Sequence, residues 1–206
     1  MVRKTKEEAL QTRQQLIDAA RRVFHRHGVS RSSLEQVARE AGLTRGALYW
    51  HFKNKIELFS AMREDAFVPM EERITAILLS DDYSDPLEAI ETSLTAFFKV
   101  LDECPTVRQV MEIMVLRCEN VEEFSEVQQE AERPAEEFRD NLEKAYTKAK
   151  AGGYLRPGLD PALLALDTWA FTSGLLHGLL SCGFEKQLKS RIGPMIAGHM
   201  ALRRSA

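Results

Sequence analysis

Apolar side chains recur every three or four residues along most of the chain, which is the spacing of one face of an α-helix. The first such run ends before Gly28, a residue type that commonly stops helices, and contains Leu16, Ile17, Ala20, Val23 and Phe24. Strands would show alternating apolar and polar residues between tight-turn dipeptides such as Asn-Gly, and the sequence has no such run. The pattern predicts an all-α fold.

Two short helices are predicted next. Ser33 stands three residues before Gln36, which is the capping-box spacing at a helix start, and Gly42 ends that helix. Thr44 can cap a further helix of about two turns over 45–52.

Longer helices follow, giving about nine in all. Asn54 with Glu57 can cap a helix that reaches about Leu79 and is bent by Pro69. The remaining helices are predicted over 86–102, 106–118, 121–151, 160–183 and a last segment ending near Arg203.

The segment 33–52 reads as a helix-turn-helix, because two short helices flank a tight turn that contains Gly42. Its apolar residues are expected to pack against one another and against the first helix: Leu34, Val37, Ala38, Leu48 and Phe52 with Val23 and Phe24. Burying Leu48 and Phe52 turns Gly46, Tyr49, Trp50 and Lys53 outward at 100° per residue. The second helix would then enter a DNA major groove by its N-terminal end.

The charge distribution agrees with this interpretation. The chain has a net charge of −3, yet residues 1–63 are strongly basic and the rest is strongly acidic. A basic N-terminal segment (the head, residues 1–63) on an acidic remainder (the body, residues 64–206) favours a polyanionic partner for the head. A basic surface that is merely solvated would give the same charge distribution.

Residues at the start and on the outer face of the second short helix are the candidate DNA contacts. Thr44, Arg45 and the free N–H groups there can bind phosphate or guanine, and Gly46 permits close approach. Tyr49 offers a hydroxyl and an apolar ring. His51 and Lys55 flank the far end, with Lys55 as a phosphate clamp. The alternative assigns the aromatic residues, including Trp50, to the core and Arg45 to a solvated surface.

Composition excludes several other classes of protein. The three cysteines are far apart and form neither a CxxC motif nor a Cys/His pair, so we expect no disulfide framework, no metal site and no cofactor. The charged start is unlike a signal peptide. Residues 163–184 are apolar enough to span a membrane, but they contain Asp167 and His177, which favours a buried helix in a cytoplasmic protein.

The sequence Thr44-Arg-Gly-Ala-Leu-Tyr-Trp-His-Phe-Lys-Asn-Lys55, preceded by Leu34-Glu-Gln-Val-Ala-Arg-Glu-Ala-Gly42, resembles the DNA-binding head of the TetR family of bacterial repressors. The opening residues 3–13 resemble the subgroup that represses multidrug efflux pump operons, and Arg117-Cys118-Glu119 is similar to a segment of that subgroup. The resemblance implies DNA contacts at Thr44, Arg45, Gly46, Tyr49, His51 and Lys55, with Ser33 near a phosphate. It also implies a homodimer with an inducer pocket in each body and a dimer contact through the last two helices.

The body carries candidates for both roles. Large apolar residues with sparse polar ones suit a pocket for a hydrophobic molecule, although each could be plain core; they are Ser93, Phe97, Met111, Met114, Val115, Phe138, Leu142, Trp169, Thr172, Ser173 and His177. Small residues every four positions allow close helix approach, so the dimer interface is predicted at Gly174, Gly178, Cys182, Met195, Ile196 and His199. A helix contact within one chain is the alternative.

The sequence thus predicts a helix-turn-helix domain over 1–55 and a ligand-binding and dimerisation domain over 56–206. The expected function is a repressor that binds a palindromic operator as a dimer, controls a multidrug efflux pump operon and is released by a hydrophobic inducer. One alternative is a related regulator, repressor or activator, of other genes. The other is a small helical enzyme or carrier using the acidic run Glu119, Glu122, Glu123 and Glu126, near which no nucleophile, metal site or cofactor loop is evident.

Overall fold

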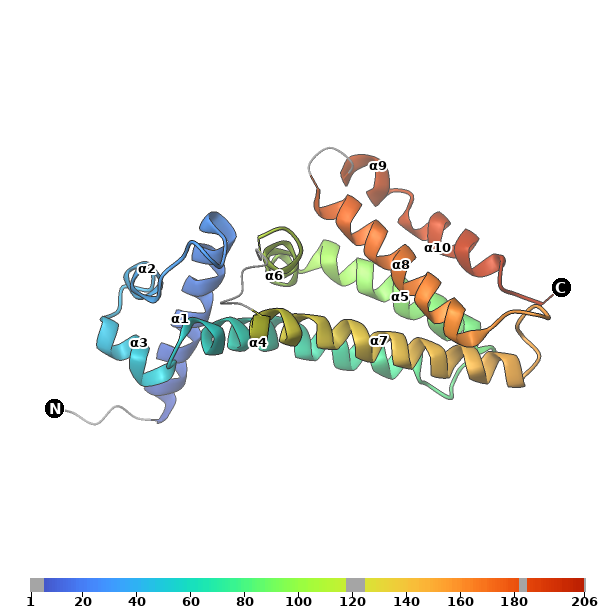
Figure 1. The fold of residues 1–206 in the computed structure, drawn as a ribbon, viewed down its shortest axis with the longest axis horizontal. Coiled ribbons are helices and arrows are strands. Elements are labelled where there is room, and N and C mark those ends of the chain that lie inside the picture. The colour runs from blue at the N-terminus through green and yellow to red at the C-terminus, as the bar shows by residue number, and fades with distance from the viewer. Residues whose placement is uncertain (1–5, 118–124, 182–184, 206) are drawn as a thin grey trace. The chain divides into compact units, whose positions relative to one another are not determined.

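The computed structural model describes residues 6–117, 125–181 and 185–205, with side chains described over 6–117, 133–181 and 186–205. This part of the chain is all-α, as predicted, and its single β interaction is an isolated bridge between Leu155 and Arg204. Figure 1 shows its ten helices: α1 (Lys6–His27), α2 (Leu34–Glu40), α3 (Arg45–His51), α4 (Lys55–Leu78), α5 (Pro86–Glu103), α6 (Pro105–Leu116), α7 (Ser125–Ala151), α8 (Pro161–Leu180), α9 (Glu185–Lys189) and α10 (Ile192–Ala201).

Prolines begin three of these helices: Pro86, Pro105 and Pro161. The first turn of a helix has no partner for its N–H groups, so a residue without an N–H fits there. The helix predicted over 106–118 therefore begins one residue earlier. Helix α9 was not predicted, because five residues are too few to show a helical period.

Contacts within the chain divide it into two compact units. Unit 1 comprises Met1–Val68 with Thr106–Ala131, and unit 2 comprises Pro69–Pro105 with Glu132–Ala206. Each point where the chain passes between units lies at or close to a proline, namely Pro69 and Pro134 inside α4 and α7, and Pro105 at the start of α6. A proline interrupts the helical hydrogen-bond ladder.

The core of unit 1 is built from aromatic and aliphatic side chains of α1 to α4. Phe24, Leu48, Phe52 and Phe59 are fully buried, and the rings of Phe24 and Phe59 lie 6.3 Å apart. Helix α2 contacts both α1 and α3, so these three helices form one packed group (Figure 1).

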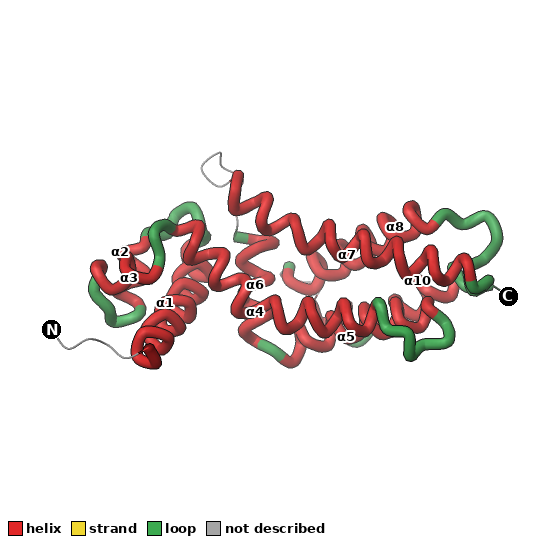
Figure 2. The backbone as a smooth tube through the Cα atoms, turned by 90° about the horizontal axis from the view of Figure 1, so that it is seen from below, coloured by secondary structure: helices red, strands yellow, loops and turns green. Residues whose placement is uncertain are grey.

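Unit 2 is a group of packed helices in which α5 contacts α10, and α7, α8 and α10 share a buried polar chain. Tyr146 of α7 lies 2.6 Å from the hydroxyl of Thr168 on α8, which lies 3.2 Å from the His199 ring of α10. Arg204, beyond α10, pairs with Asp85 at the start of α5. Arg204 also forms the isolated β-bridge with Leu155, which lies in the loop between α7 and α8 (Figure 2). This bridge joins the loop to the segment that follows α10.

Candidate nucleic-acid interface

Helix α3 packs against the core of unit 1 through one buried face (its buried edge). Leu48 and Phe52 are 0% and 1% exposed, and Leu34, Val37 and Ala38 of the neighbouring α2 are buried as well. This is the packing that the apolar spacing predicts. Because positions 48 and 52 are one turn apart, positions 46, 49 and 50 are turned away from the core, whereas Ala47 and His51 are half-buried.

The outer edge of α3 exposes two large aromatic side chains. Tyr49 is 41% exposed and Trp50 is 73% exposed, while Gly46 is exposed between them and the helix start. Trp50 is therefore not a core residue, and its ring meets the ring of His51 edge-on at 4.5 Å between centroids. Both rings are therefore accessible to a binding partner.

Side-chain caps fix both short helices. The Ser33 oxygen accepts the N–H of Gln36, and the Gln36 side chain in return accepts the N–H of Ser33, completing the predicted capping box. The Thr44 oxygen accepts the N–H of Ala47, which leaves the hydroxyl hydrogen able to donate outward. The two hydroxyls predicted to lie near phosphate thus also define where α2 and α3 begin.

Arg45 is the cation at the start of α3, and two neighbours hold it. Its Nε lies 3.2 Å from a carboxylate oxygen of Glu35 on α2, and its guanidinium carbon lies 5.2 Å from the centre of the Tyr49 ring. The pKa of Arg45 is raised, first by interaction with the Tyr49 side chain and then by Glu35. The pKa of Glu35 is lowered, first by a backbone hydrogen bond.

Lys55, which the sequence suggests as a phosphate clamp, makes two hydrogen bonds within the chain, and its phosphate contact stays a prediction. Its ammonium group donates to the backbone carbonyls of Ser30 and Ser32, at 3.1 and 2.9 Å, and the side chain is half-buried. These bonds tie the start of α4 to the turn between α1 and α2. This contact within the chain is one that the position of Lys55 in the sequence does not reveal.

A second contact that the sequence does not predict joins α1 to α6 within unit 1. The ring of His25 lies 2.7 Å from Glu112, and Arg108 pairs with the other oxygen of that carboxylate at 3.1 Å. At the same end of α1, the N–H of Val29 donates to the carbonyl of Arg117. The spacing of Arg108 and Glu112 on one helix face is visible in the sequence, but their partner on α1 is not.

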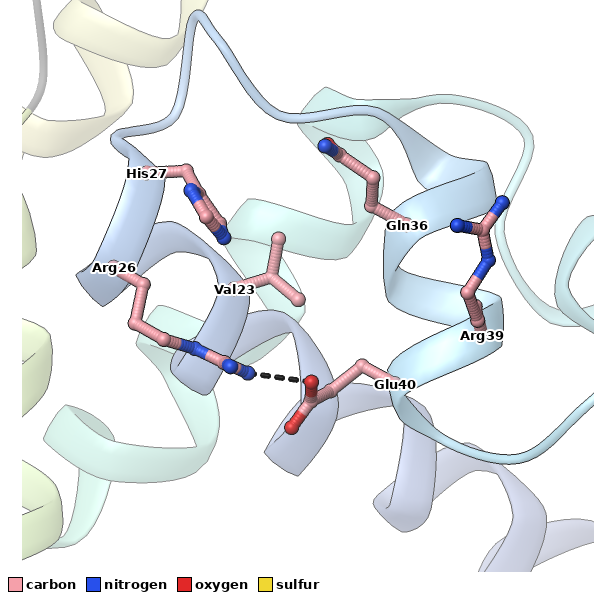
Figure 3. A pocket seen from close by; sticks show the side chains of 6 residues that line it. All are labelled: Val23, Arg26, His27, Gln36, Arg39 and Glu40. Carbon is pink, nitrogen blue, oxygen red and sulfur yellow. Dashed lines mark ion pairs between the residues drawn. The ribbon is translucent and has the colours of Figure 1, made fainter.

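An open hollow on this unit lies between the end of α1 and α2 (Figure 3). It is lined by Val23, Arg26, His27, Gln36, Arg39 and Glu40. Glu40 pairs with Arg26 and with Arg22, and these two arginines lower its pKa. Because Val23 is the single apolar residue of the six, this hollow does not suit a hydrophobic inducer.

The predicted ligand contacts divide between the two units. Met111, Met114 and Val115 lie on α6 in unit 1, and the others lie in unit 2. In unit 2 the side chains range from buried to exposed: Ser93, Leu142 and Thr172 are buried, Phe97, Phe138, Trp169 and Ser173 are half-buried, and His177 is exposed. Their assembly into one pocket stays a prediction.

Two polar residues among the predicted ligand contacts, Ser93 and Thr172, have hydrogen-bond partners in their own helices. The Ser93 hydroxyl donates to the carbonyl of Ile90 at 2.8 Å, and the Thr172 hydroxyl donates to the carbonyl of Thr168 at 2.7 Å. His177 lies on the exposed edge of α8, one turn beyond Gly174, rather than in an apolar layer. Trp169 has Arg139 over its ring at 5.6 Å.

The predicted dimer residues also fall into different environments. Gly174 and Met195 are exposed, whereas Ile196 is only 1% exposed and packs inside unit 2. A β-carbon added at Gly178 would come within 2.6 Å of Leu188 on α9, so this glycine accommodates a contact inside the chain. His199 is half-buried and stacks on Phe171 at 3.9 Å. Cys182 lies outside the described residues.

The remaining candidates concern metals, acid–base chemistry and membranes. Within the described ranges, no group of three or more His, Cys, Asp and Glu side chains could hold a metal ion. The acidic run at Glu119, Glu122, Glu123 and Glu126, and the segment 117–119 beyond Arg117, lie outside the described side chains. Helix α8 is the one described helix long and apolar enough to cross a membrane, with a mean hydropathy of 1.2. A soluble core helix can meet the same criterion.

Comparison with known proteins agrees with this geometry. A family model described as bacterial regulatory proteins, tetR family, matches residues 16–62. The transcriptional regulator TtgR of Pseudomonas putida is 35% identical over 177 residues, which cover 86% of this chain and 84% of TtgR. The crystal structure of NalD, the secondary repressor of the MexAB-OprM multidrug efflux pump in Pseudomonas aeruginosa, superposes with a TM-score of 0.85 at 29% identity, covering 97% of this chain and 98% of NalD.

A third relative has been solved with a small molecule. SmeT, the repressor of the Stenotrophomonas maltophilia efflux pump SmeDEF, has a structure in complex with triclosan. That structure superposes with a TM-score of 0.81 at 34% identity, over 95% of this chain and 92% of SmeT.

Proposed function

The chain belongs to the TetR family of bacterial regulatory proteins, and from this we propose that it is a ligand-responsive repressor of a multidrug efflux pump operon. NalD and SmeT, which resemble it over nearly their whole length, are repressors of such pumps. The observation that carries the proposal is the two-sided α3, whose buried edge fixes it in unit 1 and whose outer edge exposes Tyr49 and Trp50.

Helix α3 enters the major groove of operator DNA with its N-terminal end. Thr44 and Ser33 donate their hydroxyl hydrogens to phosphate, Arg45 reads a base edge, and Gly46 lets the backbone approach the duplex. Tyr49, Trp50 and His51 supply further contacts along the outer edge. Lys55 contributes by holding the turn behind the helix, with residues 1–55 forming the DNA-binding domain.

Two copies act together on a partly palindromic operator. Their recognition helices meet successive major grooves, about 34–36 Å apart. Exposed apolar side chains on α8 and around α10 support a contact between copies: Leu163, Leu166, Met195 and Leu202. Gly174 and His199 lie on the same two helices, whereas the side chain of Ile196 is committed to the subunit core.

A hydrophobic, drug-like molecule is the inducer. It binds within residues 56–206 and favours a conformation with a different spacing of the two recognition helices. A coupling of about 1–3 kcal/mol would lower operator affinity by roughly 5- to 150-fold. The triclosan complex of SmeT supports this chemical class of inducer. Such a regulator is cytoplasmic and performs no catalysis.

The experiment is a gel-shift titration with the DNA upstream of the protein's own gene and of any adjacent pump operon. Wild-type protein should bind one duplex specifically, and Tyr49→Ala should weaken that binding because it removes an outer-edge contact. Tyr83→Ala, in the loop before α5, is the matched control and should bind as wild type does. Triclosan and other hydrophobic drugs should release the complex.

Four results would each contradict a part of the proposal. Equal affinity for all duplexes, or an unchanged affinity of Tyr49→Ala, would show that α3 does not recognise the operator sequence. Binding that no hydrophobic compound weakens would contradict the proposed inducer. Expression of a reporter gene driven by the pump promoter should rise when the gene for this protein is deleted. Unchanged expression would contradict the pump operon as its target.

A further inference from the structure

The side chain of Glu35 places a carboxylate on the surface that is proposed to face DNA. Glu35 lies in the first turn of α2, and its side chain is 44% exposed. It forms an ion pair with Arg45, across the turn between the two helices, with 3.2 Å between a carboxylate oxygen and Nε. A free carboxylate at this place would lower affinity for DNA of any sequence. Glu35 stabilises the N-terminal end of α2, where a backbone hydrogen bond lowers its pKa first, and it also contacts Arg45.

Glu35 and Tyr49 contact different parts of the Arg45 guanidinium group. A guanidinium has two edges that can form paired hydrogen bonds, one at Nε and one at its outer end between the two terminal nitrogens. Glu35 occupies the Nε position, and the Tyr49 ring lies against the flat face at 5.2 Å. The outer edge, between the two terminal nitrogens, is the edge that matches O6 and N7 of guanine.

We propose that Glu35 is a positioning residue, which holds Arg45 with its outer edge directed at a guanine in each operator half-site. The proposal rests on the proposed DNA-binding function and adds a base preference and the residue that sets it. Glu35 and Tyr49 restrict the rotation of a long side chain before DNA arrives, so less conformational entropy is lost when the two hydrogen bonds to guanine form.

The role predicts effects of opposite sign on two measurable quantities. Removing Glu35 takes away a negative charge, so affinity for DNA of random sequence should be unchanged or higher. It also frees Arg45 to rotate, so the preference for guanine at one position of each half-site should fall. A residue that merely stabilised the fold would lower both affinities together and leave the base preference alone.

The experiment begins with an operator selected by the wild-type protein from a pool of random duplexes. Each base pair of that operator is then replaced, and affinities are measured by fluorescence anisotropy for wild type, Glu35→Ala, Arg45→Ala and the double variant. Arg45→Ala should lose guanine preference by roughly 5- to 160-fold, and Glu35→Ala by about two- to fivefold at the same position. The double variant should match Arg45→Ala, because Glu35 acts through Arg45.

Glu64→Ala is the matched control, since it removes the same charge from an exposed position on α4 and should leave base preference unchanged. Melting followed by circular dichroism confirms that each variant is folded.

Three results would overturn the proposal. Full guanine preference in Glu35→Ala would show that Arg45 needs no partner. A loss at a different base pair, additive with that of Arg45→Ala, would make Glu35 a direct reader of its own base. A rise in affinity for the operator with base preference intact would make Glu35 a competitor of DNA for Arg45. Failure of the wild type to select any sequence would instead contradict the proposed function itself.

Discussion

Replacement of Lys55 by methionine separates two roles that this side chain could have. In the structure its ammonium group donates to the carbonyls of Ser30 and Ser32, so it joins the start of α4 to the turn that precedes α2. If the ammonium group instead contacts a DNA phosphate, Lys55 contributes to operator affinity rather than to stability. Methionine keeps the length and the apolar stem of lysine but removes the charge and the hydrogen bonds.

The expected loss of stability follows from these two hydrogen bonds. Bonds that involve a charged group each contribute about 1.5–3 kcal/mol. The side chain is half-buried, and its replacement also ends the cost of desolvating an ammonium group, so the two contributions do not simply add. We expect the free energy of unfolding to fall by about 1.5–3 kcal/mol in total, which lowers Tm by about 3–12 °C in a chain of this size.

The assay combines melting with the salt dependence of operator binding. The affinity of Lys55→Met should fall, because the turn that carries α2 and α3 is loosened. The slope of log affinity against log salt concentration should stay as in wild type, because no phosphate contact is lost. Lys53→Gln, at an exposed position two residues earlier, is the control and should leave Tm unchanged.

The opposite pattern would refute this reasoning. A slope that falls by about 0.9 for each lost contact, with Tm unchanged, would show that Lys55 binds phosphate and that its bonds to Ser30 and Ser32 contribute little.

Three further predictions concern stability. His199 has its pKa lowered from 6.5 to about 4, chiefly by burial, so it is neutral in the folded chain. The unfolded chain gains a proton that the folded chain lacks as pH falls, so stability should be full above pH 6.5 and decline towards pH 4. Urea unfolding at several pH values should show a smaller decline in His199→Gln. Tyr146→Phe should lower the unfolding free energy by about 1 kcal/mol in the same assay, since it loses a buried hydrogen bond; equal stability would refute this. Ser33→Ala should cost about 1 kcal/mol in melting experiments, unlike Ser84→Ala in an exposed loop; equal losses in both would refute the role of the cap.

Much of the helix-turn-helix could be predicted from sequence because its determinants are local. The capping box at Ser33, the cap at Thr44 and the one-turn spacing of Leu48 and Phe52 each involve residues a few positions apart. Such signals fix both the ends of a helix and the direction of its faces. The outward position of Trp50 followed from the same spacing, although its aromatic character alone left burial open.

Contacts between distant residues could not be predicted in the same way. Glu35 and Lys55 find partners across turns, and a long charged side chain gives no sequence signal for which partner it takes. In unit 2 the hydroxyl of Ser93 bonds to its own helix, and Gly178 faces α9. A polar or a small side chain therefore does not reveal by itself which group it contacts. The period of α8 is also hard to read because the helix is apolar on nearly every side.

The two edges of α3 have a consequence for how such a protein changes over evolutionary time. Leu48 and Phe52 are constrained by the interior, whereas Tyr49 and Trp50 carry no part of the core. Substitutions at the outer positions can therefore accumulate with little cost to folding, and duplicated genes can diverge towards new target sites while the scaffold stays fixed. An engineer who wishes to retarget the protein can exchange the same outer positions and leave the inner ones untouched.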